Sequence, residues 1–140
     1  MVDNEGEGHL TPGVVVVDGG WNENYARVLL IEEYGGRAIV LVDGNGDGAE
    51  LELEYWNRGG DGGWASGSSS GHSSLDALGR VETWVTDMHV AAIGKAVPGS
   101  TVSLSYCGIT YSRQANEFGI WGFIAPVNPD FPEELPVVAS

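Results

Sequence analysis

The chain has 140 residues, of which 42% are hydrophobic and 22 are glycine, and 20 acidic residues against six basic ones give a formal net charge of -14. This length suits one compact domain that can bury a core. The few basic residues form no cluster, so we expect no nucleic-acid partner and no binding to an anionic membrane surface. No apolar stretch approaches the roughly 20 residues that a membrane-spanning helix needs.

The single cysteine, Cys107, rules out an internal disulfide. Small secreted domains often depend on such bridges, so one thiol favours a reducing compartment. Residues 1–8 are acidic and polar, whereas an export signal is basic and then apolar. We therefore expect a cytoplasmic protein.

The first half of the chain predicts strands and turns. Residues 1–12 are expected to form a disordered acidic segment, and the β-branched run at residues 14–17 predicts a first strand. Apolar runs at residues 27–33 and 38–42 flank a Tyr-Gly-Gly-Arg turn. That pattern predicts a hairpin of central strands.

Residues 49–56 alternate strictly between apolar and acidic side chains, which predicts a strand with a core face and a wet acidic face. The acidic face has two interpretations: it is a solvated surface that discourages aggregation, or it docks a basic partner with an aromatic anchor. The candidate partner-binding residues are Glu50, Glu52, Glu54, Trp56 and Trp64.

Residues 57–74 are rich in Gly and Ser and predict one long loop that is either functional or mobile. Trp64 in this loop either folds back onto the protein or awaits a ligand. The loop formally contains the G-x-S-x-G pattern at residues 67–71. A nucleophile elbow requires a strand before the serine and a helix after it, so we interpret this stretch as a flexible loop.

The second half predicts one or two strands in residues 81–97, then strands at 101–106, 109–113 and 118–125. The Pro-rich tail, residues 126–140, is expected to lie extended on the surface. Seven or eight short strands with Gly/Pro turns favour an all-β fold, an antiparallel two-sheet sandwich. We expect a single domain at residues 13–125.

Residues 97–126, VPGSTVSLSYCGITYSRQANEFGIWGFIAP, resemble the closing half of bacterial immunoglobulin-like domains. The shared pattern is an alternating strand, a two-residue turn, a further strand and a final Gly-aromatic strand. This resemblance implies an immunoglobulin-like sandwich with a binding or spacer role.

The sharpest local motif is DGNGDG at residues 43–48. Oxygen side chains at alternate positions, with glycine for a sharp turn, suit a hard cation such as Ca²⁺. The flanks predict strands, which excludes the helix–loop–helix calcium motif. A calcium site between strands would use Asp43, Asn45 and Asp47; a plain polar hairpin loop fits the same residues.

No nucleophile, base and orienting group can be assembled from these residues, so we expect no enzyme. The favoured function is a non-enzymatic acidic interaction module whose partner is another protein. One alternative is a small acidic inhibitor or immunity-type protein that neutralises a basic enzyme or nucleic-acid-binding protein. Another is a calcium-stabilised carbohydrate-binding sandwich that uses Trp56 and Trp64.

Overall fold

The computed structural model describes residues 9–47, 51–60, 62–72, 82–86 and 88–139. Contacts divide the chain into two compact units, Met1–Ala77 and Leu78–Ser140. The described residues form ten strands, all paired antiparallel, and one short helix. The prediction of a mostly β chain with antiparallel sheets is confirmed, although the strands outnumber the expected seven or eight.

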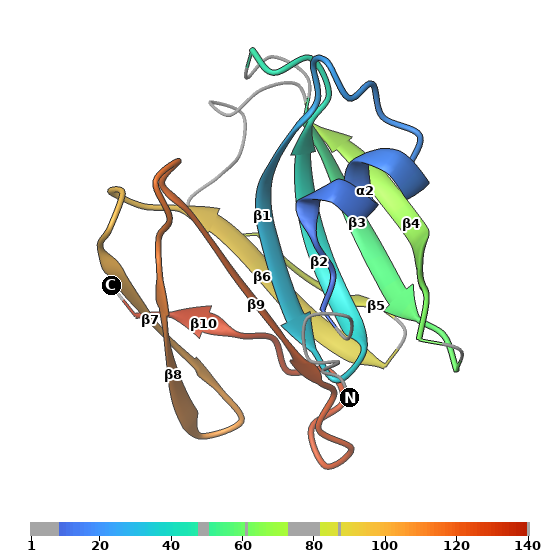
Figure 1. Cartoon of the computed structure of the whole chain (residues 1–140). Helices are drawn as coiled ribbons and strands as arrows, with labels where there is room; N and C mark the ends of the chain where they lie inside the picture. Colours follow the sequence, from blue (N-terminus) through green and yellow to red (C-terminus); the bar gives the residue numbers. More distant parts are fainter. Residues whose placement is uncertain (1–8, 48–50, 61, 73–81, 87, 140) are drawn as a thin grey trace, which may run out of the picture. The chain divides into compact units, whose positions relative to one another are not determined.

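The first unit is a four-stranded antiparallel sheet with a helix on one face (Figure 1). Neighbours along the chain are also neighbours in the sheet, so its order is β1-β2-β3-β4. The four strands are β1 (Arg27–Tyr34), β2 (Arg37–Asp43), β3 (Leu51–Arg58) and β4 (Trp64–His72). The predicted hairpin at β1 and β2 is confirmed, with both turn glycines at positive φ, as a tight two-residue turn requires.

Helix α2 (Pro12–Asp18) packs on one face of this sheet, which we call the covered face. The side chains buried there come from the segment before the helix, from the helix and from two strands. They are Leu10, Val15, Ala38, Val40, Val42 and Trp56. β2 is buried along almost its whole length, as its uninterrupted apolar run predicts.

The predicted strand at residues 14–17 is wrong, because these residues lie in α2. Thr11 adopts an extended conformation as the N-cap, and its hydroxyl accepts a 3.2 Å hydrogen bond from the backbone N–H of Val14. Pro12 occupies the first turn, where its missing N–H has no helical partner to lose. Capping and the complete burial of Val15 outweigh the weak helix propensity of four valines.

The expected lead-in at residues 1–12 falls mostly outside the described residues. Its end is packed, since Leu10 is buried in the covered face and hydrogen-bonded to β1 through its backbone. α2, the one helix in the described part of the chain, has seven residues and is too short to cross a membrane.

The predicted long loop at residues 57–74 is also wrong, because most of its described part is strand β4. β4 pairs with β3 from the Arg58↔Trp64 pair to the Leu51↔His72 pair, with an irregularity between Glu54 and Trp56. A Gly/Ser sequence has poor strand propensity, and the cross-strand partners in β3 override it. The G-x-S-x-G pattern therefore lies within a strand and forms no nucleophile elbow.

The second unit contains two three-stranded antiparallel sheets, in the orders β5-β6-β9 and β10-β7-β8. The strands are β5 (Glu82–Thr86), β6 (His89–Lys95), β7 (Thr101–Tyr106), β8 (Ile109–Gln114), β9 (Ile120–Pro126) and β10 (Val137–Val138). Side chains from β6, β7 and β9 share one core. The predicted strands at β5 to β9 are confirmed, with small shifts at their ends.

The tail of the second unit is attached to β7. β10 pairs with β7 at two positions, as an edge strand that follows Pro136. The carboxylate of Glu134 accepts a 2.9 Å hydrogen bond from the backbone N–H of Cys107 in the β7–β8 turn. The backbone N–H of Asn128 donates to the hydroxyl of Tyr106 at 2.9 Å.

Candidate functional site

Two loops interlock at the end of the first sheet where β1 begins and β2 ends. The loop after β2, residues 44–47, packs against the segment between α2 and β1. A methyl group added to Gly44 would come within 2.9 Å of the Trp21 ring, and one added to Gly46 within 2.5 Å of the Tyr25 carbonyl oxygen. Such close contacts fix both loops on the scaffold of the sheet.

These loops and the adjoining end of α2 carry exposed acidic side chains, and one of the loops carries an exposed tyrosine. Asp18, Glu23 and Asp47 are exposed, and 63% of Tyr25 is accessible to solvent. We call these four residues the acidic corner. Single exposed aromatics are common on protein surfaces, but Tyr25 lies two residues after the exposed Glu23, and its carbonyl oxygen contacts Gly46, the neighbour of Asp47.

The negative charge of the chain is distributed unequally between the two units. Residues 1–77 contain 14 acidic and three basic residues, whereas residues 78–140 contain six and three. Most of the excess charge therefore belongs to the unit that carries the acidic corner. The field of such a unit attracts cationic partners and repels anionic ones.

The predicted calcium ligands lie at the end of β2 and in the loop that follows it. Asp43 is fully buried; its Oδ1 accepts a 3.0 Å hydrogen bond from the N–H of Gly46, and its Oδ2 lies 4.0 Å from Nη2 of Arg27. Asn45 and Asp47 are exposed. A carboxylate already used by a backbone N–H and an arginine fits poorly as a calcium ligand. Calcium binding here stays a prediction.

Across the described ranges, no group of three or more His, Cys, Asp or Glu side chains is arranged to hold a metal ion. Residues 48–50, which include the last glycine of the motif and Glu50, lie outside the described residues.

The acidic face predicted for β3 is covered, so the expectation that Glu54 and Trp56 face solvent is wrong. Trp56 is fully buried and Glu54 nearly so, while Glu52 is half-buried. The alternation along β3 is present, but α2 and the segment before it cover the second face as well. Trp56 therefore cannot anchor a partner or stack on a sugar.

Glu54 instead binds two tryptophans. The indole N–H of Trp56 donates to Oε1 at 2.8 Å, and the indole N–H of Trp21 donates to Oε2 at 3.1 Å. Burial raises the pKa of Glu54 and the nearby charge of Glu52 adds to the rise, while the two indole hydrogen bonds oppose it. A buried carboxylate held by neutral donors is uncommon, because buried charges are usually paired.

Trp64 packs at the edge of the covered face, so of its two interpretations the folded-back one is confirmed. Its ring lies 5.9 Å from the guanidinium carbon of Arg58, within reach of a cation–π interaction. Its indole N–H is buried and has no acceptor within hydrogen-bonding distance in the described structure.

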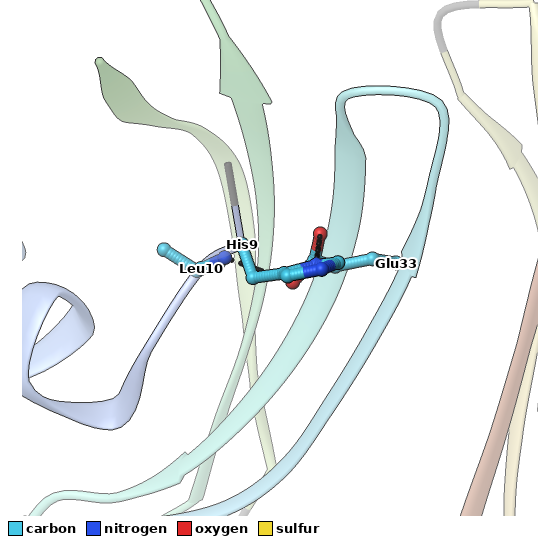
Figure 2. Close-up of polar contacts among 3 residues, drawn as sticks. All are labelled: His9, Leu10 and Glu33. Atoms are coloured by element: carbon cyan, nitrogen blue, oxygen red, sulfur yellow. Dashed lines mark hydrogen bonds and ion pairs between the residues drawn. The ribbon is translucent and has the colours of Figure 1, made fainter. Parts of the chain in front are cut away.

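A second glutamate on the same side of the sheet is held by the segment before α2. Figure 2 shows the Glu33 carboxylate between the ring of His9 and the backbone of Leu10. The N–H of Leu10 donates to Oε2 at 2.8 Å, and Nδ1 of His9 lies 3.3 Å from Oε1. His9 is largely exposed, so this contact fastens the segment before the helix to β1 and forms no enclosed site.

A scan against protein-family models, a search of curated proteins and a search of solved structures each found no match.

Sequence reasoning missed Trp21, Glu23 and Tyr25 as site residues. They lie in the stretch WNENYA, between a Gly-Gly turn and the first apolar run of β1. Two aromatics inside a polar connecting segment are the signal that would have singled it out.

Proposed function

We propose that the protein is a non-enzymatic binding module that docks its acidic corner on a basic protein. The observation that carries this proposal is the concentration of negative charge in the first unit, where exposed carboxylates and the exposed Tyr25 lie on two contacting loops and the adjoining end of α2. Complementary charge accelerates encounter with a basic partner, and an exposed aromatic side chain supplies apolar contact area.

The support beneath the corner favours a binding role. The two interlocked loops contact each other closely at Gly44 and Gly46, and Trp21 attaches them to Glu54 in β3. Loops that are already ordered lose less conformational entropy when they bind. The proposal therefore moves the docking surface from the predicted face of β3 to the acidic corner.

A small acidic inhibitor of a basic enzyme is a narrower form of the same proposal, supported by the same charge distribution. The finer fold proposal, an immunoglobulin-like sandwich, draws support from the two sheets of the second unit, whose strands share one core. A cytoplasmic location, expected from the single cysteine, completes the proposal.

The test compares two charge-matched double variants. One neutralises the corner (Asp18→Asn with Glu23→Gln) and the other neutralises exposed carboxylates of the second unit (Asp130→Asn with Glu133→Gln). Each double variant loses two negative charges, so the two variants have the same net charge. Binding of a fluorescent arginine-rich peptide is followed by anisotropy, and proteins captured from the source cells are compared for the same variants.

We expect the corner variant to bind the peptide roughly fivefold or more weakly and to lose its captured partners, while the control variant retains both. Added salt should weaken the binding of the unchanged protein. Equal losses in the two variants would show that binding follows net charge alone and would overturn the proposal, as would an absence of binding at low salt.

A further inference from the structure

We infer that Glu54 is a buried latch for the acidic corner: when its carboxylate takes up a proton, Trp21 is released and the two corner loops loosen. The consequence for docking rests on the proposed function of the corner. The latch itself is a property of the fold and can be observed without a partner.

The hydrogen bonds of Glu54 suit the ionised carboxylate. Each oxygen accepts one indole N–H, from Trp56 at Oε1 and from Trp21 at Oε2. An indole N–H is a donor only, and a carboxylate is an acceptor only, so the three groups match. A protonated carboxyl brings an O–H of its own, for which neither indole offers an acceptor. One of the two hydrogen bonds must then weaken.

The hydrogen bond from Trp21 is the one that breaks. Trp56 is fully buried and lies two residues from Glu54 on the same strand, so the packing of the covered face holds its ring in place. Trp21 is partly exposed, lies in the segment after α2 and makes the longer hydrogen bond. Its N–H can exchange the carboxyl for water at little cost, because a solvated donor does not lose its hydrogen bond.

Trp21 connects Glu54 to the acidic corner. Its ring lies against Gly44 in the loop after β2, and the ring also contacts Gly19 after α2. The same segment continues to Glu23 and Tyr25, whose carbonyl oxygen contacts Gly46. Release of the Trp21 ring therefore removes the support shared by both corner loops.

Other charged groups around the covered face surround this latch without pairing with it. His9 lies beside Glu33 and Arg27 beside Asp43, and Glu54 takes part in neither of these ion pairs. By strand register, the ionisable residues on the same face as Glu54 are Glu52 and Arg58 of β3 and Glu33 of β1 with its partner His9. The adjoining segments carry Asp18 of α2, Glu23 and Tyr25 before β1, and Asp47 after β2, and β4 ends at His72. β2 presents valines and an alanine to this face, and residues 64–71 contain no ionisable side chain.

Burial raises the pKa of Glu54 above its ordinary value. The Glu54 carboxylate therefore takes up its proton at a higher pH than an ordinary glutamate does.

The test is a pH titration followed by NMR of the tryptophan indole N–H and backbone amide signals. The signals of Trp21 and Trp56 should shift together with one midpoint above 4.5, the ordinary value for Glu. Backbone signals of residues 19–26 and 43–47 should share that midpoint. In Glu54→Gln this common titration should be absent, whereas in Glu33→Gln, which removes another glutamate beside the same face, it should persist.

A second variant covers the case in which Glu54→Gln does not fold. In Trp21→Phe the Trp56 signal should still titrate, while the backbone amide signals of the corner loops should no longer follow it.

Binding of the arginine-rich peptide should fall roughly fivefold or more across the same midpoint in the unchanged protein. Indole signals that do not titrate together would overturn the latch even if the peptide binds. Indole and corner signals that titrate without peptide binding at any pH would leave the latch standing and refute the proposed function.

Discussion

Glu54 and Trp56 lie two residues apart on β3 and meet on the covered face, where the indole N–H donates a 2.8 Å hydrogen bond to the carboxylate. The carboxylate is nearly buried, and its second oxygen accepts the N–H of Trp21. Two neutral donors compensate only part of the loss of hydration of a buried charge. The two indole hydrogen bonds therefore orient the Glu54 side chain, whereas the burial of its negative charge opposes folding.

The first prediction concerns pH and stability. Burial raises the folded-state pKa of Glu54 above the value of 4.5 for an ordinary glutamate, so the folded protein binds this proton more tightly than the unfolded chain does. The contribution of Glu54 to the free energy of unfolding must then decrease as pH rises from that value through the raised pKa. Glu54→Gln lacks this dependence. Urea denaturation at several pH values should show the variant gaining stability relative to the unchanged protein as pH rises.

The exposed Glu117 provides the control for general charge effects, since Glu117→Gln removes one charge without changing a buried group. Its stability relative to the unchanged protein should vary much less with pH. A difference for Glu54→Gln that stays constant across the titration would contradict the prediction.

The second prediction compares two tryptophans of the covered face. Trp56→Phe leaves Oε1 of buried Glu54 without its donor and should lower the free energy of unfolding by about 2–3 kcal/mol, from the lost hydrogen bond and lost contacts. Trp64→Phe removes an indole N–H that has no acceptor in the described structure. Its loss should be about 1 kcal/mol or less, because the change relieves an unsatisfied donor. If the two variants lose the same free energy of unfolding in chemical denaturation, the loss comes from the smaller ring alone, and the prediction is contradicted.

The strands of the second unit could be predicted because their signals are local. β7 and β8 combine alternating side chains with a two-residue turn at Cys107 and Gly108, so pattern and turn both indicate a hairpin. The hairpin of β1 and β2 was predictable for the same reason.

The errors fall where a distant partner decides the local structure. Four valines favour a strand, yet Thr11, Pro12 and the burial of Val15 against the sheet make residues 14–17 helical. β4 has no strand signal of its own, and its pairing with β3 supplies the missing stabilisation. Propensity describes a segment by itself, whereas packing depends on what covers it.

The candidate site was predictable to the same extent. The alternation of β3 correctly places Glu54 and Trp56 on one face, but no residue of β3 indicates that a helix covers that face. Trp21 lies 33 positions from Glu54 along the chain, so no local pattern joins them. The described loop of the motif at residues 43–48, residues 44–47, was correctly predicted, whereas the internal use of Asp43 at the end of β2 depends on Arg27 across the strand pair.

The third prediction tests the cap of α2. The hydroxyl of Thr11 accepts the N–H of Val14, one of the first helical donors that no backbone carbonyl can satisfy. Thr11→Ala should lower the free energy of unfolding by about 1 kcal/mol. Thr11→Ser retains the hydroxyl and should stay close to the unchanged protein in the same denaturation experiment. A loss in the serine variant as large as in the alanine variant would assign the effect to the methyl group and contradict the capping role.

The last prediction concerns the turn between β7 and β8. Cys107 has a φ of 52°, a left-handed conformation that most side chains adopt only with strain, and Gly108 follows with a φ of 81°. Asn tolerates this conformation better, and Asn-Gly is the preferred pair for such a hairpin. Cys107→Asn should therefore raise the free energy of unfolding by about 0.5–1 kcal/mol. Cys107→Ser keeps the strain and gives up the contact of the thiol with the core of the second unit, so it should gain no stability. Both variants keep the backbone N–H that donates to Glu134, so that contact does not distinguish them. A gain of equal size in the serine variant would trace the effect to the sulfur and refute the backbone explanation.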